Sequence, residues 1–210
     1  QESKLFPWLT VEENVGFATD VLLPIVMDNQ LFGEIIRIVE HARIAKEIGL
    51  TIREKGRAER DEQGQKKRQS DGDLVRLPGL PHCRATGWYI AEYGRGQVTM
   101  NLTDFHVTPI HAAFDRVEEL ARQHGARVTG SEIVGLVPKE TLLLAGRHYL
   151  RRQGRTVAVD ERELIEVAIL SLGLNDATRF DPAQKIIEHR VVRPGRLAGL
   201  TVLDFVAELA

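Results

Sequence analysis

Apolar residues recur every three or four positions from residue 31 to residue 55, the spacing of one face of an α-helix. Gly56 follows and predicts the end of that helix. The pattern then changes, because residues 97–104 alternate strictly between apolar and polar side chains, as a half-buried strand does. Residues 84–93 resemble a second strand, and the glycine-containing turn at residues 94–96 predicts that the two strands form a hairpin.

The second half of the chain alternates between predicted helices and one further strand. Residues 108–125 begin with Thr-Pro, a capping residue followed by proline in the first turn, and continue with an apolar stripe. Residues 127–137 predict a third strand, and helices are expected at residues 138–153 and 160–172. A final helix is expected from Thr201, with apolar residues at helical spacing behind it.

The order of these elements predicts an α+β fold. If the apolar residues 21–28 form a strand, the order is β-α-β-β-α-β, the ferredoxin-like split βαβ arrangement. It consists of an antiparallel sheet with helices packed on one face, here with extra C-terminal helices. The first strand of this topology lies in the middle of the sheet. Pro24 argues against that placement, because proline cannot donate a hydrogen bond to a neighbouring strand.

Residues 56–73 form the most polar stretch, with Ala58 as the single apolar side chain. Acidic and basic residues alternate there with nearly balanced signs. We interpret the stretch as a solvated, mobile loop. The alternative is a patch that grips phosphate, although the interspersed carboxylates weaken its field.

Composition and charge narrow the class of protein. The chain has 210 residues, a net charge of −2 and one cysteine, Cys83. The balanced charge gives no reason to expect nucleic acid or an anionic membrane as a partner. A single cysteine excludes an internal disulfide and a thiolate zinc site, and the longest apolar run, residues 21–27, is too short to span a bilayer. We expect a soluble cytoplasmic protein without a metal.

The polar face of the strand at residues 97–104 is the first candidate for binding. Gln97, Asn101 and Thr103 lie on it, and Asp104 ends the strand. This face is either solvated or the wall of a site for a polar ligand. The helix start that follows favours a carboxylate, and His111 in its first turn is either an exposed helix residue or a neutral hydrogen-bonding group.

Glu132 is a second candidate, because it lies between apolar residues of the strand at residues 127–137. Its carboxylate either faces water or binds a cationic partner, since an unpaired buried charge is costly. His106 and His111 are five residues apart and could not share a metal on one helix face. No residue of the chain is assigned a catalytic role.

Several separate strings resemble the glutamate formimidoyltransferase family. They are residues 42–57 (ARIAKEIGLTIREKGR), 85–90 (ATGWYI), 97–104 (QVTMNLTD), 108–111 (TPIH), 129–138 (TGSEIVGLVP), 146–150 (GRHYL), 172–175 (LGLN) and 180–182 (FDP). They occur in the family's order with matching gaps. The resemblance implies folate-dependent transfer of a formimidoyl group from N-formimidoyl-L-glutamate to tetrahydrofolate, in histidine degradation.

The resemblance also implies an organisation in parts. The family's enzyme has two ferredoxin-like subdomains with folate between them, and residues 31–192 resemble the second, C-terminal one. The catalytic histidine belongs to the N-terminal subdomain, so this chain would orient substrates and be inactive alone. Residues 193–210 resemble a linker and the start of a cyclodeaminase domain. Residues 1–30 are atypical, and their first part resembles a segment of ABC-type ATPases.

The partners expected from the resemblance are the two small-molecule substrates, the N-terminal subdomain, a cyclodeaminase domain and further copies of the chain. Tetrahydrofolate enters as a co-substrate. The alternatives are an inactive module that binds folate or another anion, and a truncated fragment.

Overall fold

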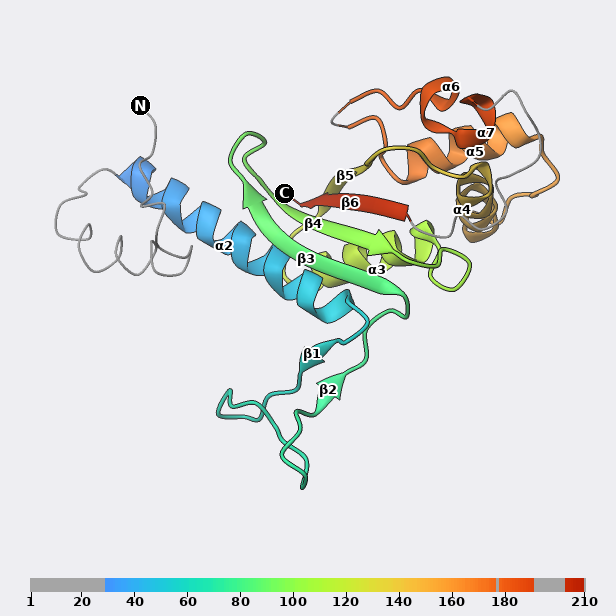
Figure 1. Cartoon of the computed structure of the whole chain (residues 1–210). Coiled ribbons are helices and arrows are strands. Elements are labelled where there is room, and N and C mark those ends of the chain that lie inside the picture. Colours follow the sequence, from blue (N-terminus) through green and yellow to red (C-terminus); the bar gives the residue numbers. More distant parts are fainter. Residues whose placement is uncertain (1–28, 177, 191–202, 210) are drawn as a thin grey trace.

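The computed structural model describes residues 29–176, 178–190 and 203–209 of the chain (Figure 1). The atypical segment expected at residues 1–30 therefore lies almost entirely outside the described residues, as does the strand expected at residues 21–28. The helices and strands are α2 (Asn29–Ile52), β1 (Arg57–Ala58), β2 (Arg76–Leu77), β3 (Cys83–Ile90), β4 (Arg95–Leu102), α3 (Ile110–Gln123), β5 (Val128–Ile133), α4 (Lys139–Arg152), α5 (Glu161–Ser171), α6 (Pro182–Lys185), α7 (Ile187–Arg190) and β6 (Leu203–Leu209).

A four-stranded antiparallel sheet is the centre of the fold, with the strand order β3-β4-β6-β5. Helix α2 lies against β3 and β4, α3 lies against β5 and β6, and the two helices touch each other. Val98, Met100 and Leu102 of β4 are fully buried in the core that these helices share. Helices α4 to α7 extend the fold beyond β5 (Figure 1). The predicted α+β class is confirmed.

The predicted hairpin and the helices predicted between residues 31 and 172 agree with the structure, but the prediction of a final helix from Thr201 is wrong. Residues Leu203–Leu209 form strand β6, which pairs with β4 on one side and β5 on the other. A place between two strands offers hydrogen bonds to both edges of the inserted segment, and this tertiary context overrides local helical spacing. The ferredoxin-like connection stays a prediction, because its first strand falls on residues 21–28.

The polar stretch at residues 56–73 forms a long extension from the main sheet (Figure 1). Strands β1 and β2 pair in antiparallel fashion, and bridges join Arg60 to Lys66 and Arg68 to Leu74. Gly64 and Gly72 adopt positive φ at its turns, the backbone conformation that glycine tolerates best. The stretch therefore forms paired turns, and their cationic side chains come close to the outer surface of α2.

Helix α2 approaches β3 closely because both elements carry glycine at the crossing point. A Cβ added to Gly49 would lie 2.7 Å from the backbone carbon of Thr86, and one added to Gly87 would overlap the carbonyl oxygen of Ala45. The contact is therefore between backbones, which leaves no room for side chains. It holds the covered face of the sheet against α2 and leaves the polar side chains on the opposite face.

Candidate functional site

The sheet face opposite α2 and α3 brings three of the predicted site residues together. Directly opposite residues of an antiparallel pair share a face. Val206 of β6 is opposite both Thr99 of β4 and Glu132 of β5, so these two residues lie on one face. Gln97 and Asn101 lie two positions on either side of Thr99 and share that face. Two strand spacings, about 10 Å, separate β4 from β5.

Strand β3 adds two side chains that the sequence did not single out. The register places Arg84 opposite Asn101 and Trp88 opposite Gln97, hence on the same face. Trp88 is 44% exposed, unusual for so large an apolar side chain, and Arg84 is exposed as well. We call the surface formed by Arg84, Trp88, Gln97, Thr99, Asn101 and Glu132 the open sheet face.

The open sheet face has the chemistry of a site for a partly aromatic, polar ligand. The guanidinium group of Arg84, the exposed indole ring of Trp88, two amide side chains and the Glu132 carboxylate are among its groups. The hydroxyl oxygen of Thr99 is buried and has no hydrogen-bond partner among the described residues. A buried hydroxyl without a partner is costly, and this one is not itself accessible to a ligand.

The other predicted site residues lie elsewhere. The Thr103 hydroxyl donates to the carbonyl of His82 at 3.2 Å, and Asp104 accepts from the backbone N–H of His106 at 2.9 Å. Both side chains therefore shape the turn between β4 and α3. His111 lies in the helical layer, where its ring stacks on that of His148 at 4.2 Å. The structure thus places Asp104 and His111 outside the open sheet face, and Thr103 in the turn directly after β4.

His111 belongs to a second polar group, centred on Asp115 of α3. The Asp115 carboxylate lies 2.8 Å from His148 Nε2, accepts from the Tyr149 hydroxyl at 3.0 Å and lies 3.2 Å from Arg152 Nη1. All three partners come from α4, so this carboxylate joins two helices. A cavity of about 360 Å³ lies beside it, lined among others by Phe114, Asp115 and Tyr149. We call the group of His111, Asp115, His148, Tyr149 and Arg152 the Asp115 cluster.

Burial controls protonation in the Asp115 cluster. It lowers the pKa of His111 to about 4, with a smaller contribution from neighbouring His148, while Asp115 acts in the opposite direction. Burial and the Asp115 carboxylate together raise the pKa of Tyr149 above its ordinary range. Near neutral pH His111 is therefore a neutral ring and Tyr149 a hydroxyl donor, which suits a structural joint between α3 and α4.

Cys83 is fully buried at the start of β3, and burial raises the pKa of its thiol to about 12. A protonated, inaccessible thiol is a poor nucleophile. Within the described ranges, no group of three or more histidine, cysteine or acidic side chains is arranged to hold a metal ion. None of the helices in the same ranges combines the length and apolarity that crossing a bilayer requires.

The fold and this site define an α+β domain in which α2 and α3 cover one face of a sheet, and in which the other face carries polar and aromatic side chains in the described part of the chain. The family model described as "Formiminotransferase domain" matches residues 35–192, and the chain belongs to this family.

Relatives carry the same assignment. The chain is 34% identical over 168 residues to formimidoyltransferase-cyclodeaminase of Dictyostelium discoideum, which covers 77% of this chain and 28% of the relative. It is 34% identical over 148 residues to the Gallus gallus protein of that name, covering 70% and 24%. Glutamate formimidoyltransferase of Thermoplasma acidophilum is 33% identical over 88 residues, covering 42% and 28%. The chain thus spans less than a third of these curated relatives.

Proposed function

We propose that this chain provides the substrate-orienting subdomain for transfer of a formimidoyl group from N-formimidoyl-L-glutamate to tetrahydrofolate. The observation that carries the proposal is the shared face of Asn101 and Glu132, flanked by Arg84 and Trp88. Membership of the formiminotransferase family supports the reaction. The open sheet face supports the part played by this chain.

Two charges on this face, those of Arg84 and Glu132, correspond to charges of the reactants. A folate amine attacks the amidine carbon of N-formimidoyl-L-glutamate. The protonated amidine group is cationic, so the Glu132 carboxylate is suited to face it. The glutamate carboxylates are anionic and match the Arg84 guanidinium, which can bind a carboxylate through two parallel hydrogen bonds. Asp104, the other carboxylate considered, already caps a turn, which favours Glu132.

The remaining groups fit tetrahydrofolate as co-substrate. Trp88 exposes an aromatic surface against which a ring of the folate can stack. The amide side chains of Gln97 and Asn101 can donate to and accept from the polar edge of such a ring. These residues bind and orient, and they need no metal for that role.

Proton transfer needs a further group. The tetrahedral intermediate collapses when glutamate leaves as an amine, which requires a general acid. None of the strand residues described on the open sheet face is a histidine, and His111 and His148 lie in the helical layer. We therefore assign the general acid to an N-terminal subdomain that would face the sheet, as a partner of this chain in the cytoplasm. A cyclodeaminase domain and further copies of the chain are the other proposed partners.

Two measurements on the full chain test this proposal separately. Titration with 5-formyltetrahydrofolate, a stable reduced folate, should quench tryptophan fluorescence, and the quenching should be lost in Trp88→Phe. An assay with N-formimidoyl-L-glutamate and tetrahydrofolate should show no turnover by the chain alone. Turnover would contradict the purely orienting role, whereas failure to bind folate would favour the truncated fragment.

A further inference from the structure

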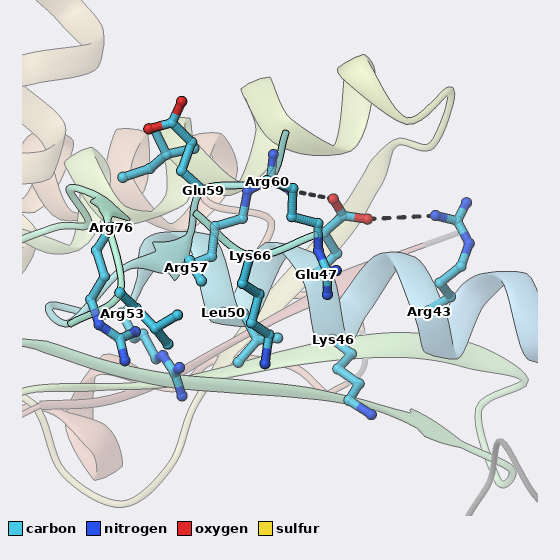
Figure 2. A pocket seen from close by; sticks show the side chains of 13 residues that line it. Arg43, Lys46, Glu47, Leu50, Arg53, Arg57, Glu59, Arg60, Lys66 and Arg76 are labelled. Atoms are coloured by element: carbon cyan, nitrogen blue, oxygen red, sulfur yellow. Dashed lines mark hydrogen bonds and ion pairs between the residues drawn. The ribbon is translucent and has the colours of Figure 1, made fainter. Parts of the chain in front are cut away.

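A large basic cavity lies between the outer surface of α2 and the extension that contains β1 and β2 (Figure 2). Its volume is about 750 Å³. Seven cationic side chains line it, against two carboxylates, Glu47 and Glu59. The cationic residues are Arg43, Lys46, Arg53, Arg57, Arg60, Lys66 and Arg76. The sheet and α2 separate this cavity from the open sheet face, so a ligand bound here would not touch the substrates proposed above.

The two carboxylates leave much of this charge uncompensated. Glu47 pairs with Arg57 and lies 3.5 Å from Arg43, as the dashed lines in Figure 2 show. Glu59 pairs at 2.5 Å with Lys67, which does not line the cavity. Four lining cations, namely Arg53, Arg60, Lys66 and Arg76, have no carboxylate partner within the described part of the chain.

Two of these cations are held beside each other. Arg53 Nε and Arg76 Nη1 both donate to the carbonyl oxygen of Gly56, each at 3.4 Å. Figure 2 shows their guanidinium groups side by side, with Lys66 pointing into the same region. The two positively charged groups repel each other. An anion bound between them would attract both and would offset this repulsion. The shared carbonyl positions both guanidinium groups before a ligand arrives.

We propose that this cavity binds an oligophosphate anion. The high density of cations matches a ligand that carries charge on each of several linked phosphate groups. Guanidinium groups bind phosphate oxygens through paired hydrogen bonds, and lysine adds a mobile point charge. The lining contains no aromatic side chain for stacking a nucleobase, so the phosphate chain itself is the recognised feature.

Calorimetric titration of the full chain with inorganic tripolyphosphate tests the proposal, with citrate and monophosphate as comparison probes. We expect one tripolyphosphate per chain, binding that weakens as salt rises, and binding at least about tenfold weaker for citrate and monophosphate. Equal binding of citrate would overturn the assignment to phosphate. Failure of tripolyphosphate to bind would overturn the site.

Variants locate the binding. Lys66→Gln, on the exposed extension, and Arg53→Gln combined with Arg76→Gln should each weaken tripolyphosphate binding, the double variant by about tenfold or more. The control is Arg151→Gln combined with Arg155→Gln, which removes the same charge as the double variant from exposed positions in the last turn of α4 and just beyond it. Circular dichroism verifies folding of each variant. Equal weakening in the control would overturn the proposal, because net charge alone would then explain binding. Unchanged binding in Lys66→Gln and the double variant would overturn it too.

Discussion

Asp115 offers the sharpest test of how the helical layer is held together. In Asp115→Ala the Tyr149 hydroxyl, on a side chain that is 6% exposed, loses its acceptor. Leaving such a hydroxyl unsatisfied costs about 1–3 kcal/mol. His148 and Arg152 are 34% and 52% exposed, and their pairs with Asp115 add at most about 1 kcal/mol each. We expect the free energy of unfolding to fall by about 2–3 kcal/mol.

A double-mutant cycle with Tyr149→Phe separates these contributions. Urea unfolding followed by circular dichroism gives the free energies of unfolding of the two single variants and of the double variant. Because the orphaned hydroxyl is gone in the Tyr149→Phe background, Asp115→Ala should cost about 1 kcal/mol less there. Additive effects within about 0.3 kcal/mol, or a cost below about 0.5 kcal/mol for Asp115→Ala, would refute this account of the Asp115 cluster.

Three further predictions concern packing and protonation. Gly87→Ala forces a Cβ against the Ala45 carbonyl and should lower the midpoint of thermal unfolding, with a cost of about 1–3 kcal/mol. Burial lowers the pKa of His111 to about 4, so only the unfolded chain protonates this ring as the pH falls from 6.5 towards 4. The free energy of unfolding should therefore fall by about 1–2 kcal/mol over that range, after solvent screening. The loss should be smaller in His111→Gln. Buried Cys83 should react with iodoacetamide only after unfolding, as mass spectrometry would detect.

Local patterns predicted most of the elements correctly. The alternation in residues 97–104 gave both the strand β4 and the face on which its polar side chains lie. The Thr-Pro start and the apolar stripe gave helix α3, whose buried residues Ile110, Ala113 and Val117 follow the predicted spacing. Both signals are properties of neighbouring residues, and the backbone geometry of strand or helix converts them directly into a buried face.

Features that depend on distant residues were not predictable in this way. Strand β6 lies between β4 and β5, and residues 203–209 alone do not indicate that place, because their apolar positions fit helical spacing as well as the alternation of a strand. Likewise, Asp115 finds its partners on α4, 33 residues or more further along the chain. The register of the hairpin, and not the local sequence pattern, places Trp88 on the open sheet face.

In the proposed function, one face of the sheet binds reduced folate through side chains from separate strands. This binding is tested most directly by the dissociation constant of 5-formyltetrahydrofolate for the variants Asn101→Ala and Glu132→Gln. Their respective controls are Gln123→Ala on α3 and Glu166→Gln on α5, and both control residues are exposed and lie outside the sheet. The account predicts binding weakened about tenfold in both face variants, the cost of one good hydrogen bond to a polar ligand, and unchanged in the controls. Undiminished binding in both face variants would contradict it.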